Sequence, residues 1–427
     1  EEMLRKDYIK QSQESETLLI HELSRVKANQ GEKIIRFGFG QSPFLPLNSA
    51  IESLRNRVEH KEYVSVQGLE ELREAVATFH NHYDKINIVA DNVLVAPGSK
   101  ILIYSIIAAF NDADIFLITP SWVSYEPQAN LAKLPVTRIQ TNFENRWRLL
   151  PSELERACEQ RENKDRPIVM VFNYPGNPDG LTYTEAELEA LTVVFRKYNI
   201  LVISDEIYGL LNHQGKHLSL ARFYPEGTIV TTGLSKWCGA GGWRLGVALL
   251  PTTIEEKLKK TIIGIGSETY SCASTPVQYA AIDAYQVGEN VDAYLAHQRR
   301  ILSVSGNYVW KTVTEAGINV HQPEGGFYLT LDFEPFRHVL KAKNIETSKD
   351  VCGSLIDQKE VAMLPGSVFG YDDDVLTTRL CYVDFDGVAA MKASEAIGLD
   401  KPLPEDFLQT YCPNVIEGSK RITDWVR

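Results

Sequence analysis

Short apolar runs alternate with longer stretches of helical periodicity along the first two thirds of the chain. Helical patterns occupy 100–110 and 184–198. The apolar runs do not alternate with polar residues, which is typical of parallel strands covered by helices on both faces. The alternation of strands and helices therefore predicts an α/β fold. The predicted strands are 93–96, 115–118, 168–172, 200–203, 228–232 and 246–250.

The last third of the chain has a different pattern. Strand-like runs at 318–321, 326–331 and 378–383 are separated by long helical stretches, which predicts a smaller α+β domain. A chain of 427 residues is too long for one hydrophobic core, so length alone favours two domains. Because no flexible linker or low-complexity tract separates the two parts, we expect them to pack closely.

The formal net charge of -12 argues against a nucleic-acid or anionic-membrane partner, since neither attracts an acidic surface. No window approaches the roughly 20 apolar residues that a membrane span needs. The first residues are charged and lack the apolar core of a signal peptide. Six scattered cysteines without CxxC spacing suggest neither a zinc site nor a disulfide framework. We expect no metal and a cytoplasmic location.

Polar segments follow the predicted strands, where ligands bind in open α/β sheets. Pro97 to Lys100 places small residues at the start of a helix, and its free N–H groups can bind phosphate. A bare helix start would look the same. Residues 173–180 contain two prolines and two glycines, which form a rigid turn that can hold the Asn177 amide. Asp205 and Glu206 are adjacent acids at the end of a buried strand, which is costly unless a cationic group meets them. That group could belong to a ligand, but a salt bridge within the protein or a cap on the next helix would also explain the two acids.

The segment 233–246 carries the strongest signal. It reads GLSKWCGAGGWRLG, with five glycines around one lysine and an arginine eight residues further on. A lysine in such a loop at the end of a strand is in a position where its amine is desolvated. Burial disfavours its charged form and leaves a nucleophilic amine. A lysine chosen at random is nearly always a surface residue, so the inference depends on the loop around Lys236.

These segments together require one ligand. It is anionic at one end, for Ser99, Lys100, Ser235 and Arg244. It also has a protonatable centre for Asp205 and a carbonyl group for the lysine. Pyridoxal phosphate meets all three requirements. NAD does not explain the lysine, and no strand leads into a GxGxxG loop.

The chain resembles the class I aminotransferases. Segment 233–246 resembles their pyridoxal-phosphate attachment signature, and 119–125 resembles the segment whose aromatic ring, here Trp122, stacks on the cofactor. Tyr63 with Gly68 resembles the segment whose tyrosine reaches the phosphate of the neighbouring subunit. The similarity covers roughly residues 30–395 and is greatest to the prokaryotic-type aspartate aminotransferases. Further motifs follow in the family's order at 324–328, 364–369 and Arg379.

The resemblance implies a fold-type I transferase with a mostly parallel seven-stranded sheet in its large domain. We expect an N-terminal segment, 1–45, that packs with the small domain, a large domain at 46–297 and a small domain at 298–427. The resemblance also implies a homodimer whose substrates are an amino acid and a 2-oxo acid.

The resemblance and the chemistry of the side chains together give the expected roles. Lys236 binds the cofactor as a Schiff base and then moves a proton from the substrate Cα. Asp205 keeps the pyridine nitrogen protonated. Arg379 offers a bidentate fork to the substrate α-carboxylate. By resemblance, Tyr208 and Asn177 bind the phenolic oxygen of the cofactor.

The remaining expected contacts surround the cofactor and its substrate. The backbone at Gly40 lies against the substrate carboxylate, and Trp122 and Asn177 also contact substrate. The phosphate is expected to meet Gly98, Ser99, Lys100, Ser235, Arg244 and Tyr63 of the neighbouring subunit.

Two positions depart from the family. Relatives place a serine three residues before the lysine, where this chain has Gly233. Ser235 and Thr232 are the two candidates for that contact with the phosphate. The usual Asn-Pro-Thr-Gly reads Asn-Pro-Asp-Gly here, with Asp179 in the place of threonine, and the sequence offers no physical reason for that acid.

Two alternatives to an aminotransferase stay open. The same scaffold supports other pyridoxal-phosphate reactions, such as those of a C–S lyase or an aminocyclopropane-carboxylate-type synthase. A regulator that senses the cofactor would need a DNA-binding module, and the 30 residues before the resemblance begins are too short for one.

The amino donor is predicted to be neutral, aromatic or cationic rather than aspartate. In some dicarboxylate-specific relatives the neighbouring subunit supplies an arginine just before a segment resembling 271–276, and residues 261–276 here contain no arginine or lysine but do contain Glu268. The alternative is that Glu268 points to solvent and that a cation comes from elsewhere, near Gln41 and Ser42. Like charges at a binding site cost on the order of a hundredfold in affinity. Catalytic efficiency should be compared for aspartate, alanine, phenylalanine, methionine, lysine and arginine with one acceptor. A catalytic efficiency for aspartate about tenfold higher than for the other donors would contradict this expectation.

Overall fold

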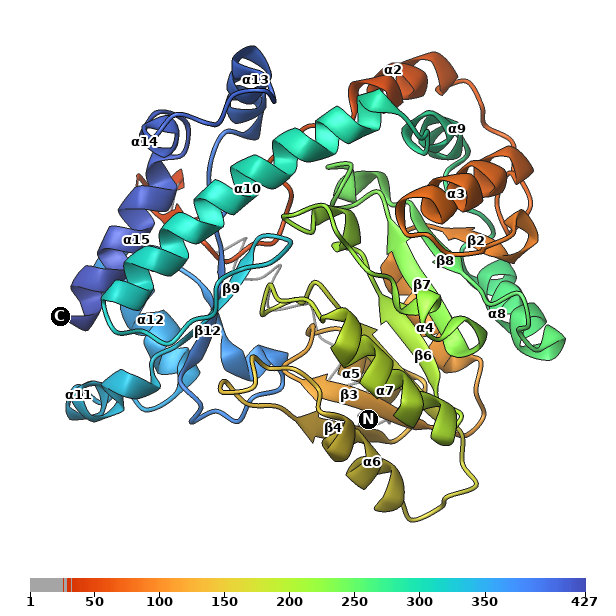
Figure 1. Ribbon diagram of the computed structural model, residues 1–427, viewed down its shortest axis with the longest axis horizontal. Helices are drawn as coiled ribbons and strands as arrows, with labels where there is room; N and C mark the ends of the chain where they lie inside the picture. Colours follow the sequence, from red (N-terminus) through yellow and green to blue (C-terminus); the bar gives the residue numbers. More distant parts are fainter. Residues whose placement is uncertain (1–25, 27–28, 32) are drawn as a thin grey trace, which may run out of the picture.

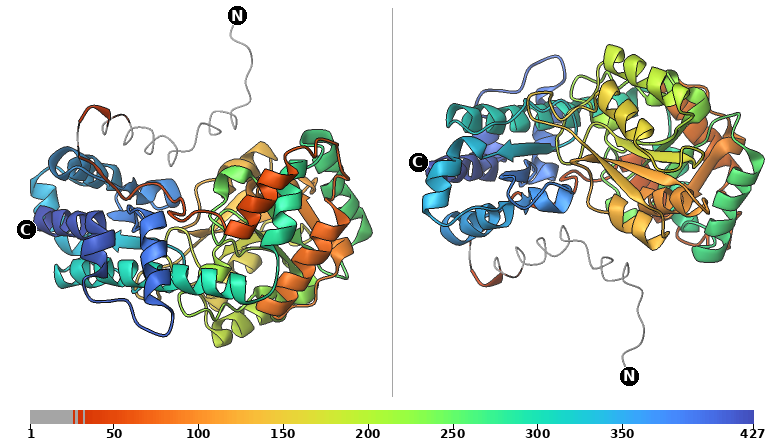
Figure 2. Two further views of the ribbon diagram at one scale, coloured as in Figure 1. Left: turned by 90° about the horizontal axis from the view of Figure 1, so that it is seen from above. Right: turned by 90° about the horizontal axis from the view of Figure 1, so that it is seen from below.

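The computed structural model describes residue 26, residues 29–31 and residues 33–427 (Figure 1). Most of the expected N-terminal segment lies outside these residues. A large part built on a twisted sheet lies beside a smaller part that contains the C-terminus (Figure 2).

The sheet of the large part has seven strands, and β8 alone runs opposite to the other six. The prediction of a mostly parallel seven-stranded sheet is therefore confirmed. The strands, in spatial order, are β2 (Val93–Ala96), β8 (Gly246–Leu249), β7 (Thr228–Gly233), β6 (Leu201–Asp205), β5 (Ile168–Asn173), β3 (Asp114–Thr119) and β4 (Val136–Gln140).

Both faces of the sheet are covered, which explains why the strands read as continuous apolar runs. In β5, Val169 and Val171 face a core shared with α4 (Ser99–Ala108) and α8 (Glu256–Thr269). Ile168, Met170 and Phe172 of the same strand face the opposite core, which includes α6 (Pro151–Glu159) and α7 (Glu185–Lys197). Successive side chains of a strand point to opposite faces, so one run supplies two cores.

The helix predicted at 184–198 is α7, and its first residues show why it begins there. The Thr184 side chain accepts a hydrogen bond from the backbone of Glu187, and the Glu187 side chain accepts one from the backbone of Thr184. This capping box satisfies two N–H groups that the helix leaves free.

The smaller part contains an antiparallel sheet of β11 (Leu364–Pro365), β12 (Thr377–Cys381) and β9 (Tyr328–Asp332), in that order. A separate pair joins β1 (Ile35–Arg36) to β10 (Val361–Ala362) in parallel. Its helices are α11 (Arg337–Ala342), α12 (Ser348–Lys359), α13 (Gly387–Ile397), α14 (Phe407–Tyr411) and α15 (Pro413–Val426).

One strand prediction in this part is wrong. Residues 318–321 make a single isolated bridge, between Asn319 and Asp332, and form no named strand. Two backbone hydrogen bonds of 2.8 and 3.0 Å join these two residues. Pro323 follows closely and has no N–H group to continue a ladder, so the chain leaves the sheet.

The long helix α10 (Glu289–Glu315) connects the two parts. Figure 1 shows it running from the neighbourhood of α2 (Asn48–Arg57) and α9 (Thr275–Ala284) to α15. The predicted boundary between 297 and 298 falls inside this helix, and the division into domains stays a prediction. Among the described residues, no helix is both long and apolar enough to cross a membrane.

Candidate active site

A large pocket opens at the carboxyl ends of β5, β6 and β7, where it meets the smaller part of the molecule. Nineteen residues line it, and eleven of them are among the thirteen predicted site residues. Gly98 lies just outside this lining, and Tyr63 lies elsewhere. The eleven are Gly40, Ser99, Lys100, Trp122, Asn177, Asp205, Tyr208, Ser235, Lys236, Arg244 and Arg379.

Lys236 follows the end of β7 and projects its amine into the pocket. Nζ donates a hydrogen bond of 2.7 Å to the carbonyl oxygen of Gly40 and lies 5.5 Å from the centre of the Tyr208 ring. Burial, assisted by the positive charge of Arg379, lowers the pKa of Lys236 to about 8. A larger fraction of the amine than in an exposed lysine is therefore uncharged and nucleophilic near neutral pH.

Asp205 is the last residue of β6 and is buried. Its Oδ1 accepts a hydrogen bond of 3.3 Å from the backbone N–H of Ile207, and its Oδ2 accepts one from the Tyr125 hydroxyl. Burial raises the pKa of Asp205 to about 6, against the opposing effect of these two donors. A buried carboxylate of this kind is suited to a cationic partner such as a protonated ring nitrogen.

The anion-binding end of the pocket is built at the N-terminus of α4. Lys100 lies over the Trp122 ring, with Nζ 5.1 Å from the ring centre, and the Arg244 side chain packs against Gly98. A Cβ atom on Gly98 would lie 2.2 Å from an Arg244 nitrogen, so only glycine admits the guanidinium there. In the described part of the chain, neither cation has a carboxylate within ion-pair distance. Two cations beside a helix N-terminus favour an anionic group such as phosphate.

The departure at Gly233 has a structural reason. A Cβ atom there would lie 2.5 Å from the carbonyl oxygen of Leu245 and 2.9 Å from Cα of Gly246. Gly246 is itself so close to Gly98 that a Cβ atom would lie 2.3 Å from the Gly98 carbonyl carbon. A serine at 233 does not fit against this stack of backbones.

Arg379 lies on β12, at the opposite end of the pocket, and is only 1% exposed. Its Nη1 donates a hydrogen bond of 3.0 Å to Asn177 Oδ1, and its Nη2 donates one of 2.8 Å to the carbonyl oxygen of Gly38. The guanidinium carbon lies 4.7 Å from the centre of the Tyr328 ring and 5.1 Å from that of Phe369. These contacts hold the planar fork in one orientation.

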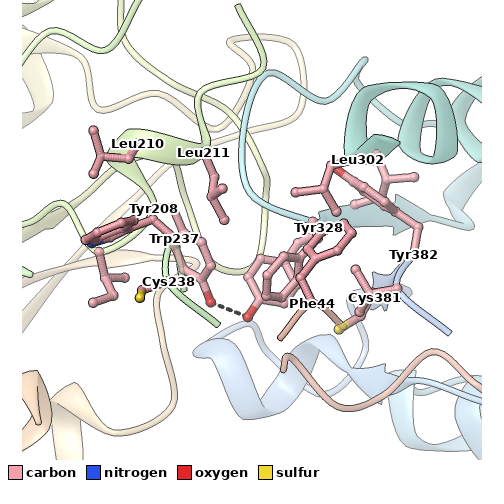
Figure 3. Close-up of a cluster of buried hydrophobic side chains, with 14 of the residues drawn as sticks. Phe44, Tyr208, Leu210, Leu211, Trp237, Cys238, Leu302, Tyr328, Cys381 and Tyr382 are labelled. Atoms are coloured by element: carbon pink, nitrogen blue, oxygen red, sulfur yellow. Dashed lines mark hydrogen bonds between the residues drawn. The ribbon is translucent and has the colours of Figure 1, made fainter. Parts of the chain in front are cut away.

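Tyr208 from the large part meets Tyr328 from the smaller part. Their hydroxyl groups are hydrogen bonded, as the dashed line in Figure 3 shows, and the rings are nearly perpendicular. Burial raises the pKa of Tyr208 well above its ordinary value. A Cβ atom on Gly40 would lie 2.2 Å from the Tyr328 hydroxyl oxygen, so the backbone of Gly40 lies directly against this ring.

Residues 32–388 match the family of aminotransferases of class I and II. The chain belongs to this family. It is 31% identical to an asparagine–oxo-acid transaminase of Streptococcus mutans serotype c, over 87% of this chain and 92% of the relative. It is 30% identical to an aspartate aminotransferase of Geobacillus stearothermophilus, over 86% of this chain and 91% of the relative.

The fold comparison agrees with the family. An aspartate aminotransferase double mutant of Thermus thermophilus superposes with a TM-score of 0.83 at 21% identity, over 100% of both chains. The expected class of fold-type I transferases is therefore confirmed. The named relatives support transamination as the reaction, and neither a lyase nor a synthase is favoured.

Sequence reasoning missed several residues of this aminotransferase pocket. Tyr125 and Tyr328 both lie in segments that resemble family motifs, but the sequence predicts no role for their side chains. Tyr125 stands three residues after Trp122 and contacts Asp205, whereas Tyr328 contacts Arg379. The pocket lining also includes Phe39, Gln41, Asn173, Ile207, Gly241 and Gly242.

Replacing Tyr125 with phenylalanine should raise the pKa of Asp205 above about 6 in the cofactor-free enzyme. The Tyr125 hydroxyl stabilises the charged carboxylate, and its loss leaves the burial penalty less compensated. Carboxyl-carbon NMR of labelled aspartate measures the midpoint. Tyr198→Phe is the matched control, since that hydroxyl contacts Glu159 on the surface. Equal Asp205 midpoints in Tyr125→Phe and the wild type would contradict the assignment.

Proposed function

We propose that this aminotransferase binds pyridoxal phosphate in the pocket described above and uses it to move an amino group from an L-amino acid to a 2-oxo acid. The observation that carries the proposal is the joint placement of three features. These are the partly buried amine of Lys236, the buried carboxylate of Asp205, and the anion-binding end with Lys100 and Arg244. The residues present fit the three polar groups of that cofactor, which are its phosphate, its ring nitrogen and its carbonyl group.

When bound, the cofactor supplies an electron sink for the electrons released at the substrate Cα. Asp205 would hold the proton on the ring nitrogen, because its buried carboxylate has no other cation at hydrogen-bond distance in the described chain. Tyr208 would hold its hydroxyl proton toward the phenolic oxygen of the cofactor, and Asn177 would contact the same oxygen. Ser99 and Ser235 would donate hydrogen bonds to the phosphate.

Lys236 would hold the cofactor covalently and afterwards take the proton from the substrate Cα with its Nζ. A pKa near 8 suits an amine that alternately accepts and returns a proton near neutral pH. The hydrogen bond from Nζ to Gly40 keeps the amine inside the pocket.

The α-carboxylate of both substrates would bind Arg379. In the described chain its guanidinium meets only uncharged oxygens, those of Asn177 and Gly38, so its charge stays available for an anion. Glu268 is exposed and does not line the pocket of its own chain. The expected preference against aspartate therefore concerns the neighbouring subunit and stays a prediction.

A two-fold homodimer is part of this proposal. Tyr63 is 88% exposed, which suits a side chain that reaches the phosphate of a second subunit. We also propose a cytoplasmic location, supported by six cysteines that are all free.

Borohydride reduction of the enzyme loaded with pyridoxal phosphate should fix the cofactor on Lys236, as peptide mapping would show. Lys236→Ala should remove both the adduct and turnover, because only an amine can bond to the cofactor's carbonyl carbon. Lys260→Ala, an exposed lysine on α8, is the control and should retain both. Finding the adduct on Lys100 would overturn the assignment.

Cofactor occupancy should fall on dilution together with the dimer, because Tyr63 completes the phosphate site only across a subunit boundary. Sedimentation with absorbance detection follows both quantities. Tyr63→Phe should weaken cofactor binding without dissociating the dimer, and a monomer that retains the cofactor would contradict the proposal.

A further inference from the structure

Five charged side chains lie together where the two parts of the molecule meet, outside the pocket, and one of them, Glu187 on α7, lies 3.8 Å from Arg146. Arg148 is paired with Asp179, and Arg146 is paired with Glu324 of the smaller part. Asp179 is the acid that stands where the resembling motif has threonine. A buried acid needs a partner, so this substitution and Arg148 are best explained together.

The Arg148–Asp179 pair is buried, with the two residues 3% and 8% exposed. All three nitrogens of the Arg148 guanidinium are occupied, since Nε donates to the Arg146 carbonyl at 2.9 Å and Nη1 donates to that of Thr182 at 3.3 Å. Its face lies 4.3 Å from the centre of the Tyr183 ring. Asp179 Oδ1 also accepts from the N–H of Leu181 at 3.1 Å. The pair therefore has a single arrangement.

The turn that carries Arg148 is strained. Arg146 and Trp147 are consecutive residues with φ of 58° and 57°, a backbone conformation that residues other than glycine rarely adopt. Hydrogen bonds of 2.9 Å to the carbonyls of Phe143 and Asn142 hold them there. This turn directs Arg148 into the interior and Arg146 toward the smaller part. Strained backbone persists where the surrounding structure fixes it, often at functional sites.

The second pair links the same turn to the segment that begins at Glu324. Glu324 accepts a hydrogen bond from Arg146 and one of 3.3 Å from the N–H of Thr182. The carbonyl of Gly180 accepts hydrogen bonds of 2.9 and 3.1 Å from the N–H groups of Glu324 and Gly325. The loop 176–182 and the segment 324–330 are therefore joined through these charges and through their backbones.

These two joined segments hold Arg379 from two sides. The loop supplies Asn177, whose Oδ1 accepts from Arg379, and the other segment supplies Tyr328, whose ring lies under the guanidinium. Thr330 also donates a hydrogen bond of 2.9 Å to the carbonyl of Pro178. A shift of the loop would therefore change the orientation of the guanidinium fork.

We propose that Arg148 and Asp179 are positioning residues for recognition of the substrate α-carboxylate: their buried ion pair holds the loop that carries Asn177, and through it Arg379. This inference rests on the proposed function, because it assigns the carboxylate to Arg379. Neither residue touches the substrate. Removing one partner leaves a buried charge uncompensated and displaces the loop, whereas removing both leaves no such charge.

The test measures transamination kinetics of the cofactor-loaded enzyme with its best amino donor and 2-oxoglutarate. Asp179→Asn keeps the size of the side chain and an acceptor for Leu181 but removes the charge. We expect the KM values of donor and acceptor to rise together, by about tenfold, with kcat within about threefold, because both substrates carry the same carboxylate and misplaced groups cost affinity. Arg148→Met should show the same pattern. The double variant should show a smaller rise than the product of the two single effects.

Two further variants keep the test decisive if a single variant fails to fold. Glu324→Gln alters a half-exposed carboxylate and should raise both KM values by about threefold. Arg196→Met removes a surface pair with Glu226 and should leave both unchanged. Unchanged KM values alongside a lower melting temperature would overturn the inference, since a purely structural pair gives that result. An inactive wild-type enzyme would refute the proposed function instead.

Discussion

The close approach of three glycine backbones, Gly98, Gly233 and Gly246, is the contact on which the pocket depends. β8 is the one antiparallel strand of the sheet, and its first residue lies against both the end of β7 and the start of α4. Without side chains at these positions, the N-terminus of α4 comes close to the loop that follows β7. That loop contains Lys236 and Arg244, so the amine and the anion-binding end are placed by one contact.

The pocket then separates its charges along its length. Cations gather beside the α4 N-terminus, a buried carboxylate occupies the centre at Asp205, and Arg379 stands alone at the far end. Asp205 and Arg379 are buried and Lys236 is partly buried, so each acts strongly on its neighbours, whereas Lys100 and Arg244 are exposed. The lowered pKa of Lys236 follows from this arrangement, since burial and Arg379 both disfavour its charged form. The same burial raises the pKa of Asp205.

Much of the fold and most of the pocket could be predicted because the relevant signals are local. Continuous apolar runs identified the central strands, and the polar residues after them identified Asp205 and Lys236. β4 was missed because Thr137, Arg138 and Gln140 interrupt its apolar pattern at the edge of the sheet. The strand predicted at 318–321 failed because pairing depends on a partner that local sequence does not specify. The same limit applies to Tyr125 and Asp179, whose partners lie 80 and 31 residues away.

Part of the proposed carboxylate site is main chain rather than side chain. The carbonyl oxygens of Gly38 and Gly40 accept hydrogen bonds from Arg379 and Lys236, and β1, a few residues earlier, is anchored by pairing with β10. No codon change can remove a carbonyl oxygen, so a mutation affects these two acceptors only by moving the backbone segment after β1 that contains them. This part of the pocket is thus set by a backbone path, and a side chain added at Gly40 would disturb that path, because its Cβ atom would lie 2.2 Å from the Tyr328 hydroxyl oxygen.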